Sequence, residues 1–231
     1  MPPWVIVPLP RTLEPAAAFA PVVGEPPLIR VLSSLADATA RERLVVASAP
    51  TLADRARECL DAAGLAAVAV TVARDPGSRQ QVLAAGLEVI AGQSDSHQPV
   101  LVCDCRHPLA SGDLAARVAG ALDGGPEVVV PTLPVTDTVK TVDATGSVLS
   151  TVDRTTLRSV QYPRGFTVSS LRDLVSTATA VASMADDIDE FDAALRAGLD
   201  VVSVEGDAGA LRFELPRDLL LLEAIIADVA D

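Results

Sequence analysis

Lys140 is the only lysine among the eighteen lysine and arginine residues of this 231-residue chain, and it lies in the segment Asp137-Thr138-Val139-Lys140. An ammonium group is a compact charge that fits a small cluster of oxygens, whereas a guanidinium group is a planar fork. A lone lysine beside an acid and a hydroxyl therefore predicts a residue that binds an anion. The alternative is an ordinary solvated lysine at the end of a strand.

Cysteine, aspartate and histidine form a second group with possible chemistry, in the segment Cys103-Asp104-Cys105-Arg106-His107. A structural zinc site needs a second ligand pair, and His97 is the only other histidine of the chain. We therefore interpret the cysteines as small buried thiols. Asp104 follows an apolar run, so it either binds a metal ion or a hydroxyl group or caps the turn that comes next.

The elements that position these residues are short apolar runs that alternate with amphipathic segments. Strands apolar on both faces, alternating with helices, predict an α/β fold with a mostly parallel sheet covered by helices. In such a sheet ligands bind past the carboxyl ends of the strands, where Asp104 is expected. The predicted strands are residues 4–7, 44–47, 68–72, 100–103, 127–130 and 201–204, and the predicted helices are residues 28–38, 51–63, 78–91, 111–122, 169–182 and 189–197, with a closing helix from residue 216.

Residues 136–152 differ from this pattern, because two β-branched runs flank the turn signal Asp143-Ala144-Thr145-Gly146. They predict a β-hairpin arm that projects from a single domain of residues 1–231. A two-stranded hairpin is marginally stable in water and needs a partner surface, so we expect a homodimer formed through this arm.

Composition limits the function. The formal net charge is −13, and 49% of the residues are hydrophobic, so the chain is globular and does not bind nucleic acid, whose phosphates require clustered cations. A small phosphorylated molecule is a suitable partner where arginines gather locally. The chain has no apolar run of about 18 residues and no basic N-terminal region, which predicts a cytoplasmic protein without membrane contact.

Several motifs follow one another in a fixed order, and together they resemble the 2-C-methyl-D-erythritol 4-phosphate cytidylyltransferase family. The Asp-Thr-x-Lys motif, followed by Val-Asp-Arg, is the most specific part. The resemblance runs from about Ser78 to the C-terminus and is weaker over the first third. Its segments are Asp104, Asp137–Lys140, Thr151–Arg154, Gln161–Phe166, the acidic cluster Asp186–Glu190 and Leu215–Leu219.

The resemblance implies a Rossmann-like nucleotidyltransferase fold and a reaction of isoprenoid precursor synthesis. The acceptor, methylerythritol phosphate, attacks the α-phosphate of CTP, with Mg²⁺ present, to give CDP-methylerythritol and pyrophosphate. Such chemistry depends on positioning and charge neutralisation around the phosphates. The implied site consists of Lys140 and Arg212 in catalysis, Asp104, Thr138 and Arg154 in substrate binding, Arg11 and Arg79 in nucleotide binding, and Asp104 as the metal ligand.

The nucleotide-binding loop departs from the family pattern, which has an alanine- and glycine-rich loop after the first strand. Here Pro8-Leu9-Pro10-Arg11-Thr12-Leu13-Glu14-Pro15 occupies this place, and the first glycine of the chain is Gly24. Glycine lets backbone N–H groups approach phosphate oxygens, whereas proline has no N–H to donate. We therefore expect CTP with Mg²⁺ to bind weakly, and a small anion to bind near Lys140, Arg154 and Arg212.

Further positions depart from the family motifs. Gln81 stands where the family has serine, His107 where it has arginine, and Tyr162 where it has threonine, while Arg212 replaces a lysine. Structural alternatives exist for several candidates: Arg154 pairs with Asp153 or Asp137, and the acidic cluster 186–190 begins a helix.

Two functions follow from these patterns. One is a nucleotidyltransferase with an altered donor loop. The other is a non-catalytic relative that keeps the fold, the arm and an anion pocket, and acts as a binding or structural dimer.

Overall fold

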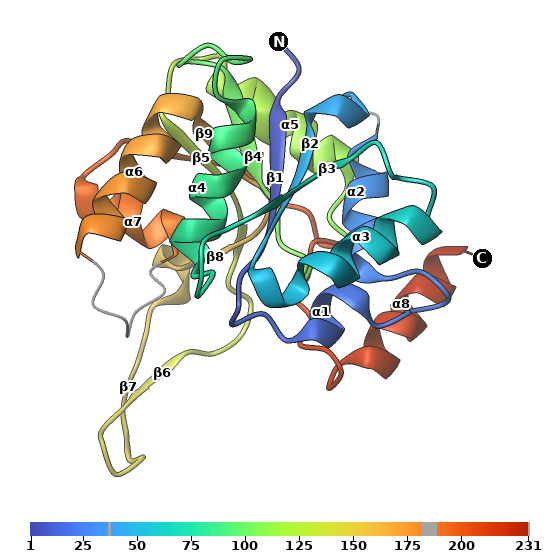
Figure 1. Cartoon of the computed structure of the whole chain (residues 1–231). Coiled ribbons are helices and arrows are strands. Elements are labelled where there is room, and N and C mark those ends of the chain that lie inside the picture. Colours follow the sequence, from blue (N-terminus) through green and yellow to red (C-terminus); the bar gives the residue numbers. More distant parts are fainter. Residues whose placement is uncertain (37, 182–188, 231) are drawn as a thin grey trace.

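The computed structural model of the chain describes residues 1–36, 38–181 and 189–230. In these ranges one central sheet has the strand order β10-β5-β9-β4-β1-β2-β3, and β8 pairs with the outer part of β5 (Figure 1). The strands are β1 (Trp4–Leu9), β2 (Leu44–Ser48), β3 (Ala69–Val72), β4 (Pro99–Val102), β5 (Val128–Pro134), β8 (Arg158–Val160), β9 (Arg164–Thr167) and β10 (Val201–Glu205).

The sheet is mostly parallel, as the sequence predicts. β1 runs parallel to both β2 and β4, and β10 runs parallel to β5. β9 lies between β4 and β5 and is antiparallel to both, a strand that the sequence pattern did not predict. Gly165 makes this insertion possible, because a Cβ atom there would lie 2.7 Å from Val118 Cγ1 of the covering helix.

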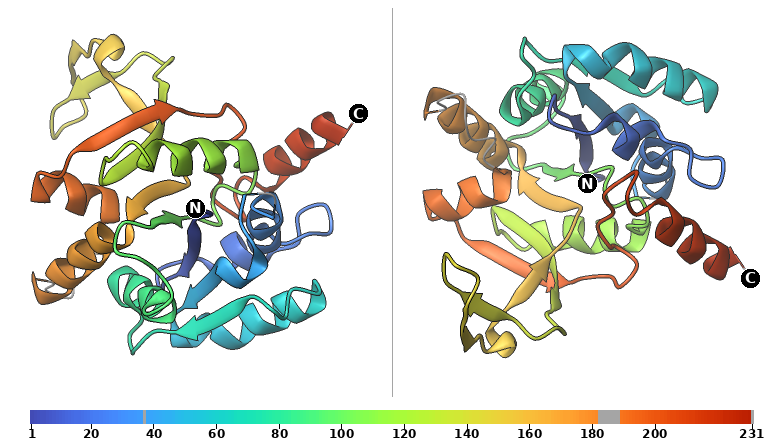
Figure 2. Two further views of the ribbon diagram at one scale, coloured as in Figure 1. Left: turned by 90° about the horizontal axis from the view of Figure 1, so that it is seen from above. Right: turned by 90° about the horizontal axis from the view of Figure 1, so that it is seen from below.

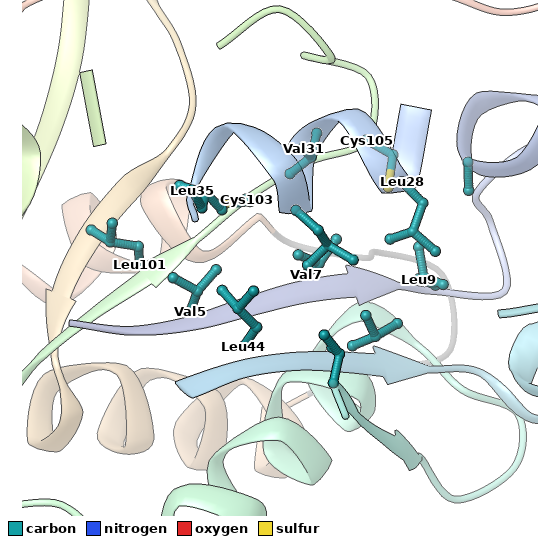
Figure 3. Close-up of a cluster of buried hydrophobic side chains, with 14 of the residues drawn as sticks. Val5, Val7, Leu9, Leu28, Val31, Leu35, Leu44, Leu101, Cys103 and Cys105 are labelled. Carbon is teal, nitrogen blue, oxygen red and sulfur yellow. The ribbon is translucent and has the colours of Figure 1, made fainter. Parts of the chain in front are cut away.

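Helices cover both faces of the sheet. On one face lie α1 (Pro15–Phe19), α2 (Pro27–Ser34), α3 (Ala53–Ala62) and α5 (Gly112–Leu122), and on the other lie α4 (Arg79–Ile90), α6 (Val168–Val181) and α7 (Glu190–Ala197) (Figures 1 and 2). Side chains alternate along a strand. Thus Val5, Val7 and Leu9 of β1 pack toward α2 (Figure 3). Trp4 and Ile6 belong to the hydrophobic cluster on the other face of the sheet, which includes residues of α4 and α6.

Local signals fix where the helices near the site begin. Ser78 and Gln81 form a capping box at α4, in which the Ser78 Oγ accepts from the Gln81 N–H and the Gln81 Oε1 accepts from the Ser78 N–H. The Oγ of Ser111 accepts from the Leu114 N–H at 3.2 Å and caps α5. Asp189 caps α7 by accepting from the Phe191 N–H at 2.7 Å.

The predicted arm is a separate two-stranded sheet of β6 (Lys140–Val142) and β7 (Val148–Thr151), and it projects from the body of the molecule (Figure 1). The Asp143 Oδ1 accepts from the N–H groups of Thr145 and Ser147, both at 2.9 Å, and so closes the turn. Apolar side chains on the arm are exposed, including Leu149 at 65%. The arm therefore presents apolar surface that nothing within the described part of the chain covers.

The closing helix α8 (Leu219–Ala230) begins three residues after the predicted start and lies outside the two main layers (Figure 2). It packs through Leu222 on a small separate cluster with Val22, Phe213 and Leu215. Among the helices of the described ranges, none is long and apolar enough to span a membrane.

Candidate functional site

A cleft of about 360 Å³ opens past the carboxyl ends of β1 and β4. This is the side of an open α/β sheet on which ligands bind. One wall is the segment that connects β1 to α1, and the opposite side carries charged groups from four other elements. The lining residues are Pro8, Pro10, Thr12, Leu13, Glu14, Ala17, Arg79, Asp104, Arg106, Asp189, Arg212 and Glu214.

Asp104 lies in this cleft, directly after β4, as the sequence predicts. Its carboxylate is buried and is bound by its neighbour Arg106, whose Nε lies 3.0 Å from Oδ1 and whose Nη2 lies 2.5 Å from Oδ2. The Arg106 N–H also donates to Oδ1 at 2.9 Å. Burial alone would raise the pKa of Asp104, but the hydrogen bonds and charge of Arg106, with the charge of Arg79, lower the pKa to about 2.

Arg79 forms the buried floor of the cleft as the first residue of α4. Its Nε lies 2.7 Å from the Glu190 Oε2 and its Nη2 lies 3.0 Å from the Oε1, and Nη2 also donates to the Tyr162 hydroxyl at 3.1 Å. The guanidinium carbon Cζ of Arg164 lies 4.1 Å from the centroid of the Tyr162 ring, and the same guanidinium forms ion pairs with Asp189 and Glu190. Arg79 thus lines the cleft with its guanidinium held by a carboxylate of this chain, and its role in nucleotide binding stays a prediction.

The acidic cluster at residues 186–190 is only partly visible, because residues 186–188 lie outside the described residues. Asp189 is the N-cap of α7 and Glu190 is its first residue, which agrees with the interpretation of the cluster as the start of a helix. Glu190 in addition supplies the buried carboxylate for Arg79 and Arg164. The sequence order gave no signal for this contact, since Arg79 and Glu190 are 111 positions apart.

Among the described residues, four carboxylates line the cleft, and their partners decide whether they can bind a divalent cation. Asp104 is engaged by Arg106, Asp189 by Arg164, and Glu214 by Arg212. In the described ranges, the remaining Glu14 has no ion-pair partner, and no group of three or more histidine, cysteine or acidic side chains converges on one point. A protein-bound Mg²⁺ needs oxygen ligands that are free to coordinate it. The residues present therefore do not fit a metal at Asp104 unless Arg106 leaves its carboxylate.

The segment from Pro8 to Pro15 forms one wall of the cleft and offers few donors to a triphosphate. Its three prolines have no N–H. The N–H of Arg11 donates to the Gly77 carbonyl and that of Leu13 to the Pro10 carbonyl, both at 2.9 Å. The side chain of Arg11 is exposed and is not among the lining residues.

The structure does not bring all predicted site residues together. Arg79, Asp104 and Arg212 line the cleft, whereas Thr138, Lys140 and Arg154 belong to the exposed arm region and do not line it. Lys140 Nζ donates to the Thr151 Oγ1 at 2.6 Å across the hairpin. Arg154 donates to the backbone carbonyl of Thr136 and, within the described residues, pairs with neither Asp153 nor Asp137, so this structural alternative is not what the fold shows.

Two residues that depart from the family pattern have structural contacts. Gln81 is part of the capping box of α4. His107 is buried, its Nδ1 lies 3.2 Å from the Ala210 carbonyl oxygen, and burial lowers the pKa of its imidazole. Arg106 was not assigned to the site from the sequence, although its position two residues after Asp104 was the available signal.

A mostly parallel sheet with a charged cleft past the carboxyl ends of β1 and β4 is the ligand-binding arrangement of open, nucleotide-binding α/β folds. Comparison with protein families matches residues 13–228 to the family described as 2-C-methyl-D-erythritol 4-phosphate cytidylyltransferase. The chain belongs to this family.

Individual relatives agree with that assignment. The chain is 35% identical over 213 residues to the 2-C-methyl-D-erythritol 4-phosphate cytidylyltransferase of Rhodococcus jostii, which covers 92% of this chain and 88% of the relative. It is also 35% identical to the enzyme of that name from Frankia casuarinae, over 90% of this chain and 74% of the relative. The crystal structure of the enzyme of the same name from Thermus thermophilus is 30% identical and superposes with a TM-score of 0.75, over 98% of this chain and all of that one.

Proposed function

We propose that this chain transfers a cytidylyl group from CTP to 2-C-methyl-D-erythritol 4-phosphate. A phosphate oxygen of the acceptor forms a bond to the α-phosphorus of CTP, the bond from that phosphorus to the bridging oxygen breaks, and pyrophosphate leaves. The observation that carries the proposal is the arginine-lined cleft at the carboxyl ends of β1 and β4 in a chain of this family. The cleft is large enough for the reacting phosphates of a small molecule.

The residues of this chain supply charge and orientation. Arg106 and Arg212 face the cleft, where they neutralise phosphate oxygens as charge builds up in the transition state. Asp104 holds Arg106 in place. Arg212 is the predicted catalytic cation, and its guanidinium pairs with Glu214 at the opening of the cleft.

Lys140, Thr138 and Arg154 enter the proposed site from a second copy of the chain. Within one chain these residues are exposed on or beside the arm and do not line the cleft. An arm with exposed Val148 and Leu149 requires a covering surface. A two-fold dimer that exchanges arms would cover this apolar surface and place the three polar side chains at the neighbouring cleft.

A divalent cation would enter this cleft with the nucleotide, because Mg²⁺ retains substrate phosphates and waters among its ligands. The altered wall from Pro8 to Pro15 predicts weak binding of CTP, since its backbone donors are few or already used. A low affinity for the donor nucleotide is thus part of the proposal.

The test is pyrophosphate release from CTP and 2-C-methyl-D-erythritol 4-phosphate by the purified chain. We expect turnover, and a fall of roughly 100-fold or more in kcat/KM for Lys140→Ala, because a cation at the transferred phosphate is lost. Arg41→Ala removes one exposed positive charge far from the cleft and is the matched control. Absence of turnover in the unaltered chain, with anion binding retained, would favour the non-catalytic relative instead.

A further inference from the structure

Arg106 is fixed by the carboxylate behind it. Three donors of this one residue, its backbone N–H, Nε and Nη2, occupy the two oxygens of Asp104. The Asp104 side chain is 4% exposed and that of Arg106 is 28% exposed, so the guanidinium lies between the acid and the open cleft. A planar guanidinium held along one edge is restricted to one orientation.

The outward edge of this guanidinium is available to a ligand. Within the described residues, Nη1 of Arg106 has no hydrogen-bond partner, and the side chain donates to Asp104 through Nε and Nη2. The residue lines the cleft together with Arg212. An arginine that shows a free edge to a polar cleft is suited to phosphate oxygens, which accept hydrogen bonds from guanidinium groups.

The other two arginines among the described lining residues cannot serve in the same way. Arg79 is buried and paired with Glu190 through Nε and Nη2. Arg212 is paired with Glu214, and its side chain is 55% exposed, so solvent screens its charge. Among the described residues that line the cleft, Arg106 is thus the arginine that is partly shielded from water and keeps Nη1 without a hydrogen-bond partner.

We propose that Arg106, oriented by Asp104, is the phosphate-binding cation of this cleft and takes the place at Asp104 that the family resemblance gives to a divalent metal. The inference rests on the proposed function only in that the ligand of the cleft is a polyphosphate. It predicts that inorganic pyrophosphate, the product of the proposed reaction, binds without a divalent cation. It also predicts that Asp104 acts through Arg106 and is a positioning residue.

The experiment is calorimetric titration of the full chain with inorganic pyrophosphate in buffer that contains EDTA, and again in buffer that contains Mg²⁺. We expect measurable binding in EDTA. Arg106→Ala should weaken it by about 10- to 100-fold, the usual effect of losing a hydrogen bond to a charged group. Arg106→Lys keeps the charge but loses the planar fork, so its affinity for pyrophosphate should lie between those of the unaltered chain and Arg106→Ala. Arg41→Ala should bind as the unaltered chain does.

Binding that appears only when Mg²⁺ is added would overturn the inference, and so would an Arg106→Ala variant with unchanged affinity in EDTA. Circular dichroism and thermal unfolding of each variant separate a lost site from a lost fold, and Arg106→Lys keeps the test decisive if Arg106→Ala does not fold. Failure of the proposed function is distinguished by the activity assay. An inactive chain would release no pyrophosphate from CTP, whereas its titrations with added pyrophosphate in EDTA would still show binding that depends on Arg106.

Discussion

Arg79 and Glu190 form a buried two-point ion pair beneath the cleft, with Nε–Oε2 at 2.7 Å and Nη2–Oε1 at 3.0 Å. The pair joins the first residue of α4 to the first residue of α7. Arg164 and the hydroxyl of Tyr162 complete the cluster around the same carboxylate. Tyr162, which stands where the family has threonine, thus belongs to one charged network with Arg79 and Glu190.

Glu190→Gln should destabilise the fold by about 3–5 kcal/mol, because Arg79 and Arg164 would remain buried without their shared carboxylate. Chemical unfolding in urea measures the loss. Asp192→Asn removes an exposed acid from the same helix and should change stability by less than about 0.5 kcal/mol. Equal effects of the two substitutions would show that the buried pair does not stabilise the fold.

The same pair predicts how stability depends on pH. Burial would raise the pKa of Glu190, but the charge and hydrogen bonds of Arg79, followed by the charge of Arg164, lower it below its ordinary value of 4.5. A carboxyl with a lowered pKa in the folded state stabilises the fold above its unfolded pKa, and this contribution is lost as the pH falls through the folded pKa. Thermal unfolding between pH 7 and pH 3 should show the loss below about pH 4.5, with a smaller loss in Glu190→Gln.

Asp104 should titrate with a pKa of about 2 in the folded chain, against an ordinary value of 3.8. This shift corresponds to about 2 kcal/mol of stabilisation, present above pH 3.8 and lost as the pH falls toward 2. NMR of the aspartate side-chain carboxyls would follow it. In Arg106→Ala the pKa should rise, because burial remains and the main hydrogen bonds are gone. A resonance that titrates at the same pH in both proteins would contradict the pairing of Asp104 with Arg106.

Gly165→Ala should destabilise the chain by about 1–3 kcal/mol through overpacking against α5. A Cβ atom at this position would lie 2.7 Å from the Val118 Cγ1 and 3.0 Å from the Leu122 Cδ1. Gly120→Ala is the matched control, since its Cβ would meet nothing within 4 Å and the helix should gain about 0.5–1 kcal/mol. Urea unfolding of both variants measures the difference. Equal stability of Gly165→Ala and Gly120→Ala would contradict overpacking between position 165 and α5.

Leu149→Asp on the arm should convert a dimer into monomers, because Leu149 is 65% exposed and would be covered in an arm-exchanged pair. Light scattering at micromolar concentration measures the mass. Leu220→Asp, at an 80% exposed apolar position of α8, is the control and should leave the mass unchanged. A monomeric unaltered chain, or dissociation by Leu220→Asp alone, would exclude the arm as the interface.

The local pattern was sufficient to place most of the strands and helices, because alternating burial along β1 and the capping signals at Ser78 and Ser111 depend on neighbours in sequence. It was not sufficient for β9, which holds the four residues Arg164–Thr167. A short run with an arginine and a glycine has no strand periodicity of its own. It becomes a strand because β4 and β5 supply hydrogen bonds on both sides.

By itself the sequence determined the family, the mostly parallel sheet, the arm and the position of Asp104, because motifs and periodicities are properties of contiguous residues. Tertiary structure alone decided which charges meet. It paired Arg79 with Glu190, 111 positions away, brought Arg212 to the same cleft as Asp104, and left Lys140 on the arm. Pairings of this kind depend on distances in space and on the cost of burying a charge without a partner, which the order of residues along the chain does not encode.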